Sequence, residues 1–197
     1  MIKNKKRCPW VPENDSLYTA YHDTEWGVVV HDDNKIFEYL ILESAQAGLS
    51  WRIVLHKRYN YKKAFANFNP KKVAKFTDGD VAKLLMNAGI IRNRQKIIAT
   101  INNAQKFLEI QKEFGSFSSY IWKFVKDKPI LHELRQLADY PKDIPEAVIL
   151  ASDLKKRGFK FLGPTVIYAH MQATGMVNDH TIDCFRHKEV SSQHKKR

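Results

Sequence analysis

The stretch KKRGFKFLGPT (residues 155–165) joins two segments whose composition favours helix. Gly158 is expected to end the first helix, because glycine readily adopts the left-handed conformation found at helix ends. Gly163 and Pro164 are expected to begin the second, since an early helical proline gives up no hydrogen bond. The free N–H groups of such a helix start, with Lys160 beside them, suit a DNA phosphate. An ordinary connection with a basic rim explains the same residues equally well.

Most of the chain shows apolar residues at helical spacing. Helices are expected at residues 34–48, 51–65, 81–88, 92–114, 118–125, 146–157 and 165–174. Residues 126–145 contain three prolines, which predict a connector with at most short structure. Only residues 28–30 look strand-like, and they are too few to count. The sequence therefore predicts an all-α fold, without a parallel sheet that could hold a dinucleotide.

The length and charge of the chain restrict the possibilities further. Its 197 residues suit one unit covering 1–197, either undivided or as two closely packed helical lobes. The polar termini, 1–7 and 188–197, are expected to be flexible. The net charge of +12 and the pI of about 9.6 favour a polyanionic partner, with nucleic acid as the first choice.

The two cysteines, Cys8 and Cys184, are too few for a four-cysteine iron–sulfur cluster and do not resemble a secreted disulfide framework. The basic amino-terminal residues are not followed by the apolar run of a signal peptide. No run of about 20 apolar residues could cross a membrane. We therefore expect a cytoplasmic monomer without membrane association.

Each cysteine has a histidine nearby in the sequence. Cys8 and His22 lie near one end, and His180 and Cys184, four residues apart, face one way on a helical turn. A Cys2His2 set matches the tetrahedral preference of zinc, and four protein ligands make such a site structural. Because the chain has eight histidines, buried thiols and ordinary polar histidines explain the spacing alone more simply.

Residues 18–27 are dense in aromatic side chains, and an acidic residue follows them on the next expected helix. Glu43 falls on the margin of the apolar face of that helix, where a carboxylate is costly unless it is paired. Either it pairs within the protein, which is the commoner outcome, or it meets a ligand. Aromatic faces beside a carboxylate could bind a flat cation. Core packing alone explains Trp10, Trp26 and Trp51 when each is taken singly.

The stretch 155–165 resembles the helix-hairpin-helix of DNA repair glycosylases, in its two-glycine form. In bifunctional members of that superfamily a lysine follows the second glycine by two positions and forms a Schiff base with the sugar. Thr165 stands at that position here. The resemblance therefore implies a monofunctional glycosylase without lyase activity.

Taken together, the motifs closely resemble the 3-methyladenine DNA glycosylase I family over nearly the whole chain, in the same order. The matching segments are 8–10, Tyr18, 21–27, Glu43, 46–51, 88–92, 155–163 and 177–180. The resemblance implies a helix-hairpin-helix glycosylase fold whose two ends meet at one structural zinc ion. Its ligands would be Cys8, His22, His180 and Cys184. It also implies base excision repair, in which 3-methyladenine is hydrolysed from double-stranded alkylated DNA and an abasic site remains.

The family's base pocket maps onto five residues of this chain. Glu43 and Tyr21 would form hydrogen bonds to the damaged base. Trp51 would stack on it, with Trp10 and Tyr18 along the wall.

The expected DNA contacts fall in two places. A loop with Gln46, Gly48 and Leu49 would enter the duplex, and the hairpin residues Gly158, Lys160, Gly163 and Thr165 would hold the backbone. Superfamily members usually carry a catalytic aspartate after the hairpin, which this family lacks. Neither Asp179 nor Asp183 is therefore given a catalytic role, and Asp183 is expected to support or border the zinc site.

Two alternative functions compete with this one. A zinc-stapled nucleic-acid-binding module without chemistry would explain the charge, the hairpin and the metal ligands. It would not explain an acidic residue beside an aromatic cluster, which would repel phosphate. A bifunctional glycosylase-lyase is disfavoured by Thr165 and by the shortage of cysteines.

Overall fold

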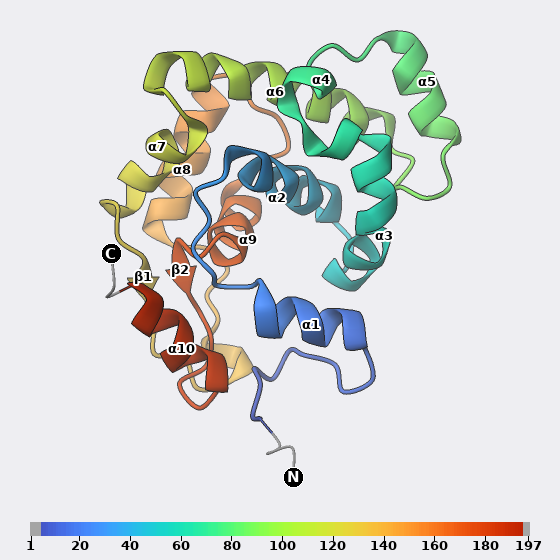
Figure 1. Ribbon diagram of the computed structural model, residues 1–197. Coiled ribbons are helices and arrows are strands. Elements are labelled where there is room, and N and C mark those ends of the chain that lie inside the picture. The colour runs from blue at the N-terminus through green and yellow to red at the C-terminus, as the bar shows by residue number, and fades with distance from the viewer. Residues whose placement is uncertain (1–4, 195–197) are drawn as a thin grey trace.

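The helix α2 (Asp33–Gln46) runs through the middle of the computed structural model, which describes residues 5–194 (Figure 1). Asp32 begins the helix by accepting a hydrogen bond from the backbone N–H of Lys35 at 2.8 Å. Side chains on every side of α2 are buried, from Ile36 to Ala45 with the exception of Glu38. Because α2 has no solvated face over this stretch, any polar group on it must lie inside the protein.

Four helices pack around α2: α3 (Trp51–Ala64), α6 (Arg94–Phe114), α7 (Phe117–Ile121) and α9 (Pro164–Ala173). Asp33, in the first turn of α2, accepts hydrogen bonds from the backbone N–H groups of Phe117 and Ser118, both at 2.8 Å. The starts of α2 and α7 are thereby held together. The outer elements are α4 (Pro70–Val73), α5 (Asp78–Met86), α8 (Pro145–Lys156) and the 3-10 turns Ala66–Phe68, Trp122–Val125 and Leu137–Asp139.

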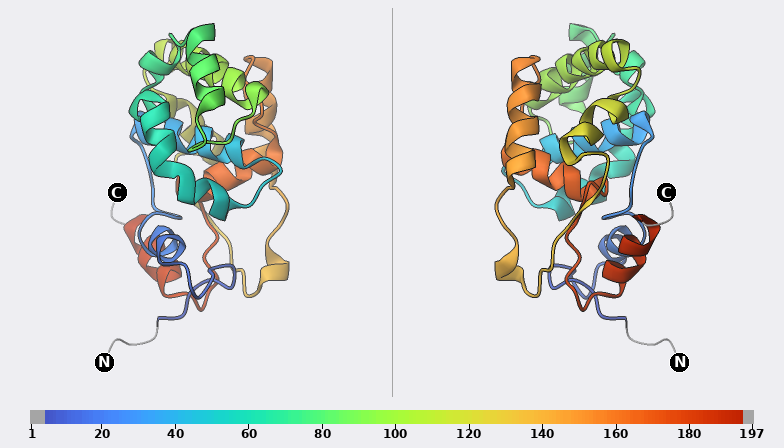
Figure 2. Two further views of the ribbon diagram at one scale, coloured as in Figure 1. Left: turned by 90° about the vertical axis from the view of Figure 1, so that its right-hand side faces the viewer. Right: turned by 90° about the vertical axis from the view of Figure 1, so that its left-hand side faces the viewer.

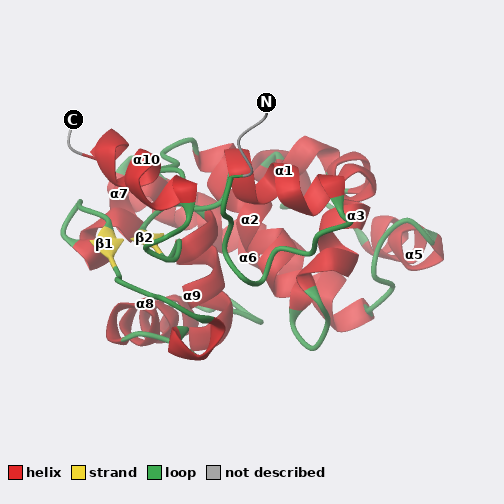
Figure 3. Ribbon diagram, turned by 90° about the horizontal axis from the view of Figure 1, so that it is seen from below, coloured by secondary structure: helices red, strands yellow, loops and turns green. Residues whose placement is uncertain are grey.

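A smaller part of the protein lies below this helical body (Figure 2). It contains α1 (Ser16–Thr24) and α10 (Phe185–His194), which Figure 3 shows at the same end of the molecule. The backbone N–H of Phe185 donates to the carbonyl of Lys6 at 3.0 Å, so the two chain ends meet here. Two short parallel strands, β1 (Ile130–Leu131) and β2 (Val177–Asn178), connect this part to the helical body.

The prediction of a mostly helical fold is confirmed, with two corrections. The short strands β1 and β2 make the fold almost, but not completely, all-α. Residues 28–30, which were too few to count as a strand, form none; the N–H of Val30 donates to the carbonyl of Thr174 at the end of α9. The helices α1, α4 and α10 were not expected.

The expected flexible termini lie partly within the described residues. The helix α10 runs through residues 188–194, whereas residues 1–4 and 195–197 lie outside the described part. No helix within residues 5–194 combines the length and the apolar character needed to cross a membrane.

Replacement of Gly175 by alanine tests the close approach of residues 28–30 to the end of α9. A Cβ atom at Gly175 would lie 2.4 Å from the carbonyl carbon of Val28 and 2.5 Å from the nitrogen of Val29, and the φ of +69° disfavours any side chain. We expect Gly175→Ala to lower the free energy of unfolding in urea by about 3 kcal/mol or more. The control is Gly115→Ala, with a φ of +82° and open space around it, for which about 1 kcal/mol is expected. Equal losses in the two variants would contradict this packing.

Candidate active site and metal centre

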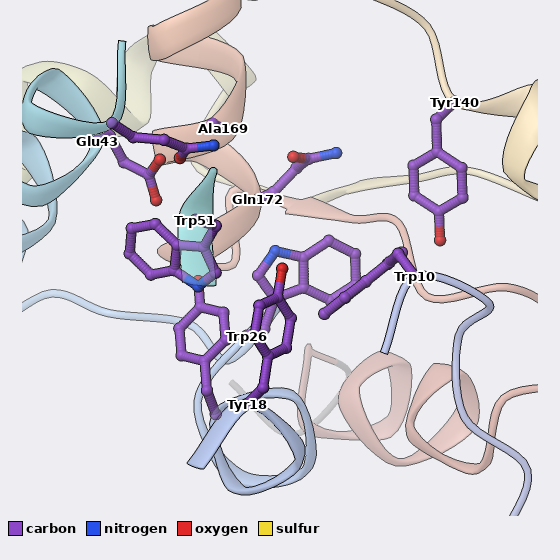
Figure 4. A pocket seen from close by; sticks show the side chains of 10 residues that line it. Trp10, Tyr18, Trp26, Glu43, Trp51, Tyr140, Ala169 and Gln172 are labelled. Carbon is purple, nitrogen blue, oxygen red and sulfur yellow. The ribbon is translucent and has the colours of Figure 1, made fainter. Parts of the chain in front are cut away.

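A cavity of about 180 Å³ lies between the helical body and the smaller part of the protein (Figure 4). Drug-sized ligands occupy cavities of roughly 300–1,000 Å³, so this one suits a single flat ring system. The lining residues are Trp10, Tyr18, Tyr21, Trp26, Glu43, Gln46, Trp51, Tyr140, Ala169 and Gln172. All five residues predicted to form the base pocket are among them.

The carboxyl group of Glu43 is the unusual feature of this pocket. It comes from the central helix α2 and is 4% exposed, so it lies inside the protein rather than on the margin of an apolar face. No hydrogen bond or ion pair among residues 5–194 reaches it, and burial raises its pKa to about 8. A carboxyl group in this state is mostly neutral at pH 7 and ionises when a cation is placed beside it.

Aromatic rings form the walls that face Glu43. The rings of Tyr21 and Trp51 lie 5.2 Å apart between centroids, and those of Trp10 and Trp26 lie 4.7 Å apart. The buried indole N–H of Trp51 has no hydrogen-bond partner among the described residues and is available as a donor. Rings of this kind attract a cation through their faces. The pocket therefore combines the two features that bind a flat cation.

The helix α1, which carries Tyr18 and Tyr21, is held against α3 by one buried carboxylate. Asp15 caps α1 by accepting from the backbone N–H of Tyr18 at 3.1 Å. The same side chain accepts from Nε2 of His56 and from Nε of Arg52 on α3, both at 2.8 Å. These contacts set the distance between the aromatic residues of α1 and those of α3.

A second cavity, of about 160 Å³, adjoins the first and shares Glu43, Gln46 and Ala169 with it. Its other lining residues are Ala47, Gly48, Leu49, Thr165 and Val166. The predicted loop thus lies beside the start of α9. Lys96 holds this loop, because its Nζ donates to the carbonyl oxygens of Ala45 at 2.8 Å and Ala47 at 2.6 Å. Leu49 is 40% exposed, an unusual degree for leucine.

The hairpin between α8 and α9 has the helix end that was predicted for it. Gly158 has a φ of +91°, and its N–H donates to the carbonyl of Lys155 at 3.0 Å. The N–H of Phe159 donates to the carbonyl of Leu154, also at 3.0 Å, which completes a Schellman motif. Gly163 then caps α9 and leaves its first N–H groups without a side-chain partner.

Asn103 on α6 holds the tip of the hairpin. Its side chain forms two hydrogen bonds to the backbone of Lys160, one to the N–H and one to the carbonyl, both of 2.8 Å. The side chains of Lys160 and Thr165 remain exposed. Arg157, another basic residue of the hairpin, is less available to bind phosphate, because it forms ion pairs with Asp153 and Glu113.

The four predicted metal ligands lie together in the smaller part of the protein. Cys8, His22, His180 and Cys184 are all buried, and their ligand atoms lie within 4.8 Å of one another. The sulfur of Cys8 is 3.4 Å from Nδ1 of His180, and that of Cys184 is 3.5 Å from Nε2 of His22. Tetrahedral zinc with ordinary bond lengths places sulfur and nitrogen ligands about 3.5 Å apart. The spacing therefore fits a metal ion of this kind.

The second nitrogen of each histidine is held by a hydrogen bond that turns the first toward the cluster. Nδ1 of His22 donates to Asp23 at 2.7 Å, and Nε2 of His180 donates to the carbonyl of Trp26 at 3.0 Å. Such partners orient histidine ligands in metalloproteins. Asp183 takes no part in this cluster; it is exposed and forms an ion pair with Lys6.

Sequence reasoning missed three residues of the pocket, Tyr140, Ala169 and Gln172. Tyr140 lies in the proline-rich connector, which has no periodicity that could place it. Gln172 follows Thr165 and Ala169 along one face of α9, and all three line the two cavities. The signal that could have identified Gln172 was its polar side chain on the same face of the helix as Thr165.

The comparisons with known proteins agree with this geometry. Residues 10–187 match the family model for methyladenine glycosylase. DNA-3-methyladenine glycosylase 1 of Escherichia coli K12 is 46% identical over 179 residues, which cover 91% of this chain and 95% of that protein.

Solved structures give the same result. A crystal structure of 3-methyladenine DNA glycosylase I matches with a TM-score of 0.89 and 48% identity, over 91% of this chain and 98% of that one. The Staphylococcus aureus 3-methyladenine DNA glycosylase I, solved to explain 3-methyladenine recognition, matches with a TM-score of 0.85 and 38% identity, over 87% and 92% of the two chains. The chain therefore belongs to the methyladenine glycosylase family.

Proposed function

We propose that the protein hydrolyses the N-glycosidic bond of 3-methyladenine in alkylated double-stranded DNA, as a monomer and as the first step of base excision repair. The observation that carries this proposal is the unpaired carboxyl group of Glu43 inside an aromatic cavity of ring-system size. The family membership and the names of the relatives support the choice of base.

Methylation at N3 gives the purine a positive charge, and the pocket distinguishes bases by that charge. A cation beside Glu43 favours the ionised carboxylate, which then offers a charge-assisted hydrogen bond. An unmodified adenine carries no charge and leaves the carboxyl group neutral. Trp51 stacks on the base, Tyr21 donates a hydrogen bond, and Trp10 and Tyr18 line the wall. Discrimination therefore rests on charge as well as shape.

The chemical step needs little help from the protein. The bond between C1′ and N9 breaks with its electron pair passing to the base, which leaves neutral because it was cationic. Water adds its oxygen to C1′ and loses a proton, so the products are free 3-methyladenine and an abasic site. Extruding the nucleotide costs a few kcal/mol. Leu49, with Gln46 and Gly48, would fill the gap that it leaves in the duplex.

The hairpin would hold the DNA backbone without reading its sequence. The unpaired N–H groups at the start of α9 and the exposed side chain of Lys160 suit phosphate oxygens. Gly158 and Gly163 allow the backbone to approach closely. Thr165 stands where a lyase would carry its lysine, and a hydroxyl group forms no Schiff base, so we propose a monofunctional enzyme.

We further propose that Cys8, His22, His180 and Cys184 hold one structural zinc ion. The spacing of their ligand atoms and the hydrogen bonds behind both histidines support this choice of metal. Zinc bound here would tether the amino-terminal segment to the carboxyl end. With four protein ligands it would have no open position for water.

Excision by the Glu43→Gln variant tests the base pocket. Glutamine keeps the shape but cannot become an anion, so kcat/KM for release of 3-methyladenine from methylated DNA should fall about 10- to 100-fold. Glu109→Gln is the matched control, because Glu109 is exposed on α6 and pairs only with Lys106. Unchanged excision by Glu43→Gln would refute the assignment of this pocket.

The same substitution should stabilise the protein in the absence of DNA. The pKa of Glu43 is about 8 in the folded protein and near its ordinary value of 4.5 when unfolded. Because the folded pKa is the higher one, stability is lost as the pH rises from about 4.5 through 8. Glu43→Gln removes this loss, so its stability advantage over the unsubstituted protein should grow between pH 5 and 9, reaching a few kcal/mol. A difference that stays constant with pH, in urea unfolding measured at each pH, would contradict the burial of this group.

Metal analysis tests the ligand set. The purified protein should contain about one zinc per chain, and Cys184→Ser should lower both the zinc content and the melting temperature. Asp183→Asn, one residue away and outside the cluster, should keep its zinc. Full metal occupancy in Cys184→Ser would show that other residues hold the ion.

A further inference from the structure

A carboxylate that is completely buried, Asp179, lies behind the wall of the pocket and accepts three side-chain hydrogen bonds. Its Oδ1 accepts from Nδ1 of His132 at 2.6 Å. Its Oδ2 accepts from Nε2 of Gln172 at 2.6 Å and also from the hydroxyl of Tyr168. Of these partners, Gln172 is the one that lines the pocket.

This contact determines how the amide of Gln172 is oriented. The carboxylate oxygen that meets it is an acceptor, so the amide must present its NH2 group to Asp179. The opposite orientation would place two oxygen atoms against each other. The carbonyl oxygen Oε1 is therefore left for the pocket, and Figure 4 shows the side chain reaching into it from α9. The backbone is held as well, because the carbonyl of Gln172 accepts from the N–H of Gly27 at 3.0 Å.

Tyr140, on the same side of the pocket, also contacts Asp179. Its hydroxyl donates to the backbone carbonyl of Asp179 at 3.0 Å. The hydroxyl also lies within reach of the side chains of Cys8 and Trp10, so it is engaged within the protein. Of the two pocket residues that contact Asp179, Gln172 is therefore the one that presents a hydrogen-bond acceptor to the cavity.

The position of Gln172 along α9 indicates which part of the nucleotide it meets. Thr165 and Val166, at the hairpin, line only the outer cavity, and Ala169 lines both cavities. Gln172, one turn further on, lines only the inner cavity. An extruded nucleotide enters from the hairpin with its sugar outward, so its Watson–Crick edge reaches furthest inward. Gln172 therefore faces the base and not the DNA backbone.

We propose that Gln172 determines specificity, and that Asp179 is a positioning residue that acts through it. Oε1 of Gln172 accepts a hydrogen bond from the 6-amino group of the extruded base. A purine with a 6-oxo group, such as 3-methylguanine, would bring a second acceptor against Oε1 and leave both oxygens unpaired. This inference rests on the proposed function and adds the selection of adenine over guanine to it.

A competition assay tests the proposal. DNA carrying both 3-methyladenine and 3-methylguanine is given to the enzyme, and the ratio of the two kcat/KM values is taken from the released bases. We expect the unsubstituted protein to prefer 3-methyladenine, and Gln172→Met to lower that ratio about tenfold, since methionine has no amide oxygen. Gln105→Met is the matched control, because Gln105 is exposed on α6, outside the pocket, and its amide donates to the carbonyl of Ala74; its ratio should stay the same.

Asp179→Asn tests the positioning role. Asparagine can turn its own NH2 group toward Gln172, which releases or reverses the amide, so the ratio should move in the same direction as in Gln172→Met. Asp183→Asn should leave it unchanged. Because both substrates compete for the same folded molecules, partial unfolding of a variant lowers both rates and cancels in the ratio.

The outcomes separate the two claims. If the unsubstituted protein releases no 3-methyladenine, the proposed function itself fails. If it does release 3-methyladenine and the ratio of Gln172→Met equals that of the unsubstituted protein, the role of Gln172 is refuted while the proposed function stands. A lowered ratio in Gln172→Met with an unchanged ratio in Asp179→Asn would refute the positioning role of Asp179.

Discussion

Burying the carboxyl group of Glu43 without a partner costs folding free energy. The proposed selectivity of the pocket for a cation depends on this buried group. The residue sits on the central helix α2 and is only 4% exposed, at the wall of the pocket. A neutral carboxyl group is tolerable in such a place, but a charged one requires a cation. The protein thus holds a group whose favourable state appears only when a positively charged ligand arrives. Strain of this kind is common at functional sites, where stability is given up for binding.

The group of Cys8, His22, His180 and Cys184 lies beside the pocket, and the two share segments of the chain. Trp10 follows the ligand Cys8 by two residues, and Tyr21 directly precedes His22. The rings of Trp10 and His22 are 5.1 Å apart between centroids. The carbonyl of Trp26, a pocket residue, accepts the hydrogen bond that orients His180. Because pocket aromatics lie close in the chain to Cys8 and His22, a structural ion held by these residues would also hold the aromatic wall in place.

The sequence allowed the local features to be predicted, because they depend on residues close together in the chain. The glycines of the hairpin indicated the helix end at Gly158, and the apolar spacing indicated α2. The metal ligands could not be paired from spacing, since Cys8 and His180 are 172 residues apart, and the family resemblance was needed to bring them together. The burial of Glu43 also exceeded the expectation, because a period of apolar residues does not reveal that helices cover α2 on all sides.

The hydrogen bonds that join Tyr140 and Gln172 to Asp179 could not be predicted from the sequence, for a physical reason. Tyr140 and Asp179 are 39 residues apart. Gln172 is only seven residues from Asp179, but the orientation of its amide follows from the acceptor that the fold places behind it. Nothing in the local sequence states which group will be that acceptor. The short helix α1 was not predicted either; the Asp15 side chain that caps it also contacts His56 and Arg52 on α3, which lie far away in the sequence.

The most direct test of this account is an NMR titration of the Glu43 carboxyl carbon in the protein without DNA. A buried and unpaired carboxyl group predicts a midpoint at about pH 8. A midpoint near the ordinary glutamate value of 4.5 would mean that water or a cation already satisfies the group, and the account of the pocket would be wrong.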